Sequence, residues 1–315
     1  MIDSNFKIYQ APLQGLTDFT FRNVHHKYFN HIDEYFTPYL VFENDGSIKK
    51  SRLNEVVPEN NTINNLTPQV LVKDAAETVR MLQLLTDYGY NSVNFNLGCP
   101  YPMVTKRGRG SALLQHPEAV NSILEAAFAH FQGTVSVKMR CGLVDFAEQT
   151  PVLEVLNQFQ LSNLFLHPRI GKQLYKGTPN IEAFMQARDI YQSEIVYNGD
   201  INSAEDMEQL QSTIGTASGL MIGRGLLQNP QLPEALKEAE TNIDADKLRS
   251  FHEELFVSYQ NRLSGDSHLL QKMRQFWEYF CMSFPNSRKV FKSIKKANNL
   301  EQYWQAVQAA FSLFY

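Results

Sequence analysis

The chain has 315 residues, of which 43% are hydrophobic and 20% charged, and its formal net charge is −4. This composition is typical of a globular protein and excludes a nucleic-acid binder that relies on overall positive charge. We expect no membrane span, because no apolar run approaches about 18 residues, and the N-terminus lacks the apolar core of a signal peptide. Three widely spaced cysteines form no metal-binding pattern and favour a reducing, cytoplasmic compartment.

Short apolar segments recur along the chain, and each is followed by turn residues and a helical pattern. The predicted strands are residues 7–13, 34–42, 69–72, 92–97, 135–140, 163–167, 194–198 and 219–222. Asp74 and Ser203 are predicted helix N-caps, and residues 43–66 are interpreted as a long loop insertion. Eight strands alternating with helices predict an α/β fold, a (β/α)8 TIM barrel, with an open doubly wound sheet as the alternative.

The pattern changes after about residue 240, where only helical periodicity remains. We therefore predict a barrel domain over residues 1–240 and a small all-helical C-terminal domain over residues 241–315. Residues 266–298 carry seven Lys and Arg residues against two acidic residues. Such a patch can bind phosphates although the whole chain is acidic, and a solvated helical face is the alternative. The best candidates for phosphate contacts are Lys272, Arg274 and Lys295.

Polar residues follow almost every predicted strand, which is where barrels carry their functional groups. Lys138 lies inside an apolar strand and needs an anionic partner there. The last two strands end in Asn198-Gly-Asp200 and Gly223-Arg-Gly225, which predict a phosphate site, with ordinary tight turns as the alternative. We interpret Lys138, Gln69 and Asn96 as facing a flavin ring. Such a ring is stabilised by a cation near its N1–C2=O edge and by amide partners at its pyrimidine edge.

Cys99 ends a predicted buried strand in the sequence Gly98-Cys-Pro100. It can be a structural thiol, a nucleophile, or a general acid that stays protonated near neutral pH. The following loop, residues 101–111, is basic and glycine-rich but is no P-loop. We interpret it as a mobile loop over a polyanionic substrate, and a plain flexible loop is the alternative.

Six motifs occur in one order along the chain: Ala11-Pro-Leu-Gln-Gly-Leu-Thr-Asp18, Asn96-Leu-Gly-Cys-Pro100, Val137-Lys-Met-Arg140, His167-Pro-Arg169, Asn198-Gly-Asp-Ile201 and Met221-Ile-Gly-Arg-Gly225. Together they resemble the tRNA-dihydrouridine synthases. The resemblance implies an FMN enzyme that reduces specific uridines in tRNA to 5,6-dihydrouridine, with NADPH reducing the flavin. It also implies that hydride passes from flavin N5 to uracil C6 and that Cys99 gives a proton to C5.

The resemblance further implies roles for individual residues. The positions that match FMN-binding residues of the family are Pro12, Leu13, Gln14, Gln69, Lys138, His167, Asn198, Gly199, Asp200, Gly223 and Arg224. Asn96 and Arg169 resemble substrate-side residues, and Lys106 and Arg107 supply charge in the loop after Cys99. The helical tail resembles the family's tRNA-binding domain by placement and charge.

The chain departs from the family pattern at Leu13, where Met is usual, and at Ile170, where Thr is usual. These departures leave the target uridine open. Two alternatives remain: an FMN barrel acting on a free pyrimidine or small enone, like a dihydroorotate dehydrogenase, and a non-catalytic RNA-binding protein without flavin. We expect a monomer without an obligate protein partner and without a bound metal.

Overall fold

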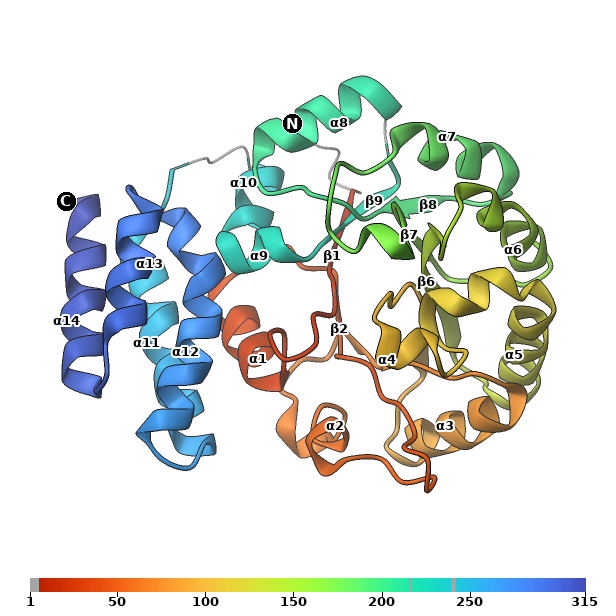
Figure 1. The fold of residues 1–315 in the computed structure, drawn as a ribbon, viewed down its shortest axis with the longest axis horizontal. Coiled ribbons are helices and arrows are strands. Elements are labelled where there is room, and N and C mark those ends of the chain that lie inside the picture. Colours follow the sequence, from red (N-terminus) through yellow and green to blue (C-terminus); the bar gives the residue numbers. More distant parts are fainter. Residues whose placement is uncertain (1–5, 216, 239–241) are drawn as a thin grey trace.

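Nine parallel strands form one sheet that closes into a barrel, and helices surround it (Figure 1). The structure is a computed structural model that describes residues 6–215, 217–238 and 242–315. The strands are β1 (Lys7–Gln10), β2 (Glu34–Phe36), β3 (Leu66–Thr67), β4 (Gln69–Val70), β5 (Ser92–Leu97), β6 (Thr134–Gly142), β7 (Leu164–Ile170), β8 (Ile195–Tyr197) and β9 (Gly219–Ile222).

The two ends of the sheet are neighbours in the chain. The strand order is β3-β2-β1-β9-β8-β7-β6-β5-β4, and only Pro68 separates β3 from β4. Proline has no backbone N–H and interrupts the hydrogen bonds between strands, so β3 and β4 together occupy one strand position of the barrel. A bridge between Leu40 and Val70 adds to the closure. The predicted barrel with eight strand positions is therefore confirmed.

Most predicted strands are found, although several of them begin or end at other residues than predicted. The bounds of β5 and β9 agree with the prediction, whereas β7 continues to Ile170. β2 ends at Phe36 instead of residue 42, because Pro38 cannot continue the ladder. The interpretation of residues 43–66 as one loop is wrong, since they include helix α2 (Lys50–Leu53), a 3-10 turn at residues 58–60 and the start of β3.

The helices on the barrel have the predicted starts at two positions. The Asp74 side chain accepts a hydrogen bond from Glu77 N at 2.8 Å, and Ser203 Oγ accepts one from Asp206 N at 3.1 Å. These two residues cap α3 (Ala75–Asp87) and α8 (Ala204–Ile214). The other helices of this part are α1 (Phe19–Tyr28), α4 (Pro102–Thr105), α5 (Pro117–His130), α6 (Gln149–Leu156), α7 (Ile181–Ile190), α9 (Arg224–Gln228) and α10 (Leu232–Glu238).

Four further helices lie together at one edge of the barrel, next to α1 and α9 (Figure 1). They are α11 (Ala245–Arg262), α12 (Asp266–Phe280), α13 (Ser287–Lys296) and α14 (Leu300–Phe311). Their apolar faces meet around Trp277 and Tyr303, which are fully buried. The predicted domain boundary at residues 240 and 241 lies outside the described residues, and the division into two domains stays a prediction.

A buried carboxylate joins the C-terminal helices to the barrel. Asp18 caps α1 and accepts hydrogen bonds from Tyr259 Oη at 2.8 Å and from Arg262 Nη2 and Lys272 Nζ at 2.9 Å each. Burial by itself would raise the Asp18 pKa, but the charges of Lys272 and Arg262 outweigh it and hold the pKa below its ordinary value. Lys272 Nζ also donates to Gly15 O at 2.9 Å, in the turn between β1 and α1.

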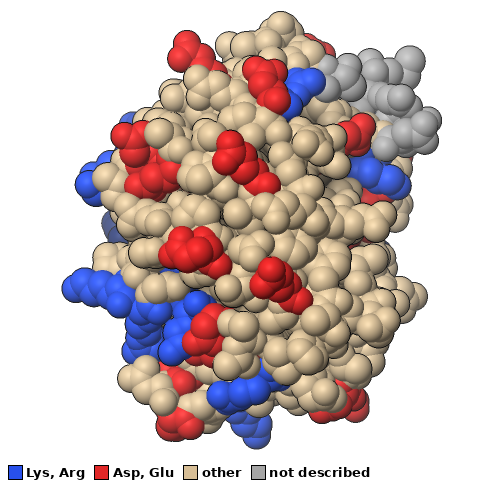
Figure 2. Space-filling model, turned by 90° about the vertical axis from the view of Figure 1, so that its right-hand side faces the viewer, with Lys and Arg blue, Asp and Glu red and all other residues tan. Residues whose placement is uncertain are grey.

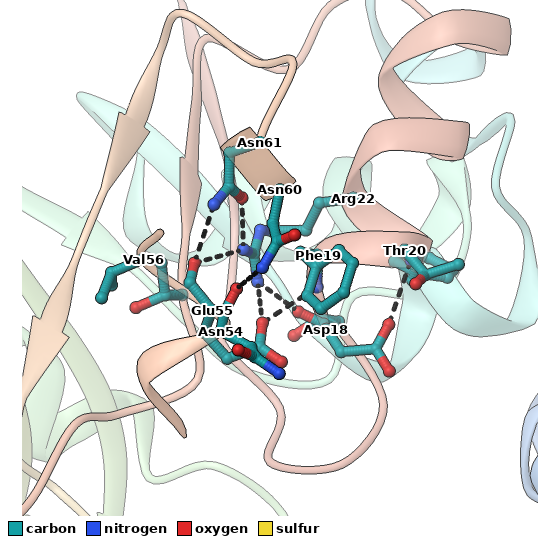
Figure 3. A network of polar contacts seen from close by, with 12 residues as sticks. Asp18, Phe19, Thr20, Arg22, Asn54, Glu55, Val56, Asn60 and Asn61 are labelled. Carbon is teal, nitrogen blue, oxygen red and sulfur yellow. Dashed lines mark hydrogen bonds and ion pairs between the residues drawn. The ribbon is translucent and has the colours of Figure 1, made fainter. Parts of the chain in front are cut away.

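A second network of polar contacts holds the same turn from the barrel side (Figure 3). The fully buried Arg22 donates from Nη1 to Thr17 O and to Glu55 Oε2, each at 2.9 Å. Its Nη2 donates to Glu55 O at 3.0 Å and to Asn61 Oδ1 at 2.9 Å. Arg22 therefore ties the turn after β1 to the insertion between β2 and β3.

We predict that Lys272→Met lowers the free energy of unfolding by about 1–3 kcal/mol, because it leaves the buried Asp18 carboxylate with one cation fewer. Lys295 is exposed on α13, so the control variant Lys295→Met should stay within about 0.5 kcal/mol of wild type. Urea unfolding of both variants measures the difference. Equal stabilities would contradict a joining role for Lys272.

Candidate functional site

A cavity of about 500 Å³ opens at the C-terminal ends of the barrel strands. All eleven predicted cofactor-binding residues line it, together with Asn96 and Cys99. Below it, Tyr9, Phe36 and Phe165 fill the barrel interior, and the rings of Tyr9 and Phe165 pack edge to face with centroids 4.9 Å apart. The interior is thus closed below and open above, as a barrel active site requires.

The register of three strands arranges one wall of the cavity. Asn96 on β5 is paired with Lys138 on β6, and Arg140 on β6 with His167 on β7. Because side chains alternate along a strand, Lys138 and Arg140 share the inner face, while Met139 between them is fully buried on the other. The polar residues that the sequence places at strand ends therefore meet in one layer.

Three amide side chains form a continuous chain along this wall. Asn96 Nδ2 donates to Gln69 Oε1 at 2.7 Å, Gln69 Nε2 to Asn94 Oδ1 at 2.8 Å, and Asn94 Nδ2 to Ser136 Oγ at 2.9 Å. Asn96 Oδ1 accepts from the backbone N–H groups of Gly98 and Cys99 at 3.0 and 2.9 Å. This chain holds Asn96 and Gln69 in one orientation and fixes the backbone at Cys99.

Cys99 lies at the cavity with only 8% of its surface exposed. Burial raises the pKa of its thiol, and the nearby cations Arg140 and Lys138 oppose this rise only in part. The thiol therefore keeps its proton at neutral pH. Its backbone oxygen accepts from Ser111 N and Oγ at 3.0 and 3.1 Å, and Gly110 has a positive φ of 62° beside it. The loop is therefore anchored at this end.

Lys138 brings a positive charge into the cavity without a counter-ion. Among the described residues no carboxylate or other hydrogen-bond acceptor contacts its Nζ, since none of the ion pairs or hydrogen bonds of the structure involves it. Burial and, to a smaller extent, the charge of the nearby Arg140 lower the pKa of Lys138 to about 7, against a small opposing effect of Cys99. An anionic ligand would remove this cost, so the residue fits a negatively charged group.

His167 is held in one neutral form. Arg169 Nη1 lies 2.9 Å from His167 Nε2, and because arginine can only donate, Nε2 accepts and the ring proton is on Nδ1. Burial lowers the His167 pKa well below its ordinary value, and the charges of Arg140 and Lys138 add to the effect. His167 therefore offers an N–H donor and not a cation.

Asp200 is the one carboxylate that lines the cavity among the described residues. Arg169 donates to both of its oxygens, with 3.0 Å from Nη1 to Oδ1, and Arg224 Nη2 donates to Oδ1 at 2.6 Å. Burial alone would raise the Asp200 pKa, but these two arginines hold it below its ordinary value. One carboxylate facing Lys138, Arg140 and the two arginines leaves the site positively charged.

Some predicted substrate-binding residues lie away from the cavity. Arg169 is fully buried and lies behind Asp200, with Nη2 also donating to Gly177 O at 2.6 Å. Lys106 and Arg107 are exposed at the end of α4, and Arg274 donates to the backbone oxygen of Ala297. Lys295 is exposed, whereas Lys272 belongs to the Asp18 network. Their roles toward a substrate stay predictions.

Several aromatic residues of the cavity were not predicted. Tyr39, Tyr101, Tyr175 and Tyr279 all line it, and Met103 lies beside them with 73% of its surface exposed. Arg140 and Arg224 lie over the Tyr175 ring, 5.5 and 4.7 Å from its centroid. Patterns at strand ends indicate only residues next to strands, whereas Tyr279 belongs to α12, far away in the sequence.

Two kinds of feature are absent from the part of the chain that the structure describes. None of its helices is both long and apolar enough to cross a membrane. No three His, Cys, Asp or Glu side chains gather there as metal ligands.

The fold and the site define a class: a TIM-barrel protein whose open end holds a protonated thiol, an uncompensated lysine and a cluster of arginines. The family described as dihydrouridine synthase matches residues 9–312. The chain therefore belongs to the dihydrouridine synthase family.

Individual relatives agree with this assignment. The chain is 27% identical over 278 residues to tRNA-dihydrouridine synthase B of Pasteurella multocida, covering 86% of this chain and 78% of that protein. It is 26% identical over 228 residues to tRNA-dihydrouridine(16) synthase of Vibrio parahaemolyticus, covering 70% and 69%. The solved structure of morphinone reductase shares the fold, with a TM-score of 0.52 at 10% identity over 76% of this chain and 88% of that chain.

We predict that Lys138→Met stabilises the ligand-free protein. Between about pH 7 and the ordinary lysine pKa near 10.4, the unfolded chain binds more protons than the folded one, so stability rises with pH and the cost of Lys138 is largest below pH 7. The gain should be about 1–3 kcal/mol near neutral pH and vanish toward about pH 10.

Urea unfolding of the ligand-free protein across this pH range measures the gain. Lys292→Met, which removes an exposed lysine of α13, is the control and should show no pH-dependent difference. A Lys138→Met protein that is less stable than wild type at neutral pH would contradict the uncompensated charge.

Proposed function

We propose that this protein reduces specific uridines in tRNA to 5,6-dihydrouridine, with FMN as its bound cofactor and NADPH as the reductant. The observation that carries the proposal is the protonated Cys99 in the same cavity as the uncompensated Lys138. Membership of the dihydrouridine synthase family and the names of its relatives support the choice of uridine and of tRNA.

The residues of the cavity fit FMN at both ends. Arg224, with Asn198 and the backbone of Gly199 and Gly223, provides a charged phosphate site at the ends of β8 and β9. Lys138 would offer its charge to the negative charge that a flavin ring takes on when it is reduced. The amides of Gln69 and Asn96 and the N–H of His167 provide further partners, and the turn with Pro12, Leu13 and Gln14 closes one side.

When bound, FMN supplies the hydride that is added to C6 of the uracil ring. Cys99 then donates the thiol proton to C5, so the C5=C6 double bond becomes a single bond and the sulfur is left as thiolate. Arg140 and Lys138 are close enough to stabilise that thiolate until it takes a proton from solvent. Asn96, which holds the backbone at Cys99, keeps the donor in place.

The tRNA body is held by the C-terminal helices in this proposal. Five exposed cations lie on α13, and none of them forms an ion pair with a described residue: Arg288, Lys289, Lys292, Lys295 and Lys296. The barrel face away from these helices carries scattered acidic residues as well as basic ones, and the largest basic group lies at its lower left (Figure 2). We propose a monomer that acts in the cytoplasm, where tRNA is its partner.

We predict that Cys99→Ala slows dihydrouridine formation in an unmodified tRNA transcript at least about 100-fold, because the proton donor is lost. Reduction of the bound flavin by NADPH should continue at the wild-type rate, as stopped-flow absorbance can show. Cys281→Ala, which removes a thiol outside the cavity, is the control.

Loss of flavin reduction in Cys99→Ala would contradict the role as proton donor. Free uridine in place of tRNA tests the alternative that the barrel acts on a free pyrimidine or small enone. Reduction of free uridine as fast as of tRNA would favour that alternative.

We predict that neutralising the α13 cations weakens tRNA binding through phosphate contacts. Lys292→Met and Lys295→Met should each lower the affinity and flatten its dependence on salt, with the slope falling by about 1 per lost contact. Lys7→Met is the matched control, because Lys7 lies at the start of β1, the barrel end opposite the cavity. Fluorescence anisotropy at several salt concentrations measures the slopes, and unchanged slopes would contradict an RNA-binding face on α13.

A further inference from the structure

Four tyrosines surround the cavity mouth, and they come from four distant parts of the chain. Tyr39 follows β2, Tyr101 follows Cys99, Tyr175 follows β7 and Tyr279 lies on α12. Tyr101 and Tyr175 keep 47% and 39% of their surface exposed. Exposed aromatic groups that gather at one opening indicate a contact surface for a ligand.

Tyr279 is the member of this group that the C-terminal helices contribute. Its helix buries Phe276 and Phe280 in the core, whereas Tyr279 is half-buried and turned to the cavity. Within the described chain its hydroxyl makes no hydrogen bond, and its ring stacks on no aromatic or cationic side chain, unlike Tyr175, which lies under Arg224. One side of the Tyr279 ring packs against the hydrophobic core, and the part that lines the cavity is therefore available to a ligand.

The position of α12 beside the cavity is held at two points. Lys272, two turns before Tyr279, donates to Gly15 O in the turn that lines the cavity. Just after the helix, Ser283 Oγ donates to Gln228 O at the end of α9, the helix that begins with Arg224. These contacts fix the backbone on both sides of Tyr279, so its ring is presented to the mouth by a rigid element.

Other cavity groups lie near the Tyr279 hydroxyl. Burial raises the Tyr279 pKa, Glu278 and Tyr101 add to the rise, and Arg224 opposes it. The hydroxyl is therefore neutral, and Tyr101 and Arg224 are its neighbours across the mouth. The ring thus lines the same cavity as Tyr101 of the anchored loop and as the arginine of the proposed phosphate site.

We propose that Tyr279 is a substrate-contacting residue whose ring, together with Tyr101, stacks on a tRNA base beside the uridine that enters the cavity. This inference rests on the proposed function. A uridine must leave the base stack before its C5–C6 edge becomes accessible, which leaves a neighbouring base without a stacking partner. Aromatic side chains replace such a partner. Because α12 and α13 pack against each other, one body would contact both that base and the phosphates.

Substitution of Tyr279 tests the stacking contact by equilibrium binding of an unmodified tRNA transcript to the full-length protein. Tyr279→Leu should weaken binding about tenfold, whereas Tyr279→Phe, which keeps the ring, should stay within about twofold. The salt dependence should not change, because no ionic contact is lost. Tyr315→Leu, at an exposed tyrosine of the same region, is the control.

An unchanged affinity in Tyr279→Leu would overturn the proposal. So would a loss as large in Tyr279→Phe, or an equal slowing of flavin reduction by NADPH, which would assign the residue to the nicotinamide. Tyr279→Trp gives a second readout: its added fluorescence should be quenched by tRNA more strongly than that of wild type. The two tryptophans of wild type are Trp277, which is fully buried, and Trp304, which is partly buried on α14. Equal quenching would overturn the proposal.

Failure of the proposed function has a different signature. A wild-type protein that binds tRNA but forms no dihydrouridine would refute the reaction, while the binding and fluorescence of the Tyr279 variants would still decide the stacking contact. A wild-type protein that does not bind tRNA would overturn both.

Discussion

The ammonium group of Lys138 lies in the open end of the barrel without a counter-ion among the described residues, and burial lowers its pKa to about 7. Arg140 and Arg224 line the same cavity, and Asp200, which pairs with Arg224 and with the buried Arg169, is the one carboxylate among the described cavity residues. A folded chain tolerates such an imbalance when a ligand supplies the missing negative charge. The charge of the cavity therefore limits which cofactor it can hold. The same cations would stabilise the thiolate that remains when Cys99 gives its proton away.

The barrel and the C-terminal helices depend on each other through the turn after β1. That turn contributes Pro12, Leu13 and Gln14 to the cavity, while Arg22 holds it from the barrel side and Lys272 from the helical side. The basic segment that contains Lys272 predicts a contact between this residue and RNA. Its contacts with Asp18 and Gly15 give it a structural task, and α13 retains the exposed cations.

Much of the site could be predicted because barrels place functional groups at strand ends, and short strands are readable from sequence. Most of the residues predicted for the site, from Pro12 to Arg224, line one cavity, and the buried Arg169 is an exception. The charge state of Lys138 and the tautomer of His167 could not be predicted, since both follow from burial and from neighbours on other strands. The place of Tyr279 in the cavity could not be predicted, because no local sequence pattern of α12 indicates that this helix lies against the cavity mouth.

The most direct test is the cofactor content of the purified protein. We would release any bound chromophore by denaturation and identify and quantify it by chromatography and mass spectrometry. The account predicts FMN at about one molecule per chain, or uptake to that level when FMN is added to protein that has lost it. Colourless protein that takes up no FMN would contradict the central claim that the charge of this cavity is matched by a flavin.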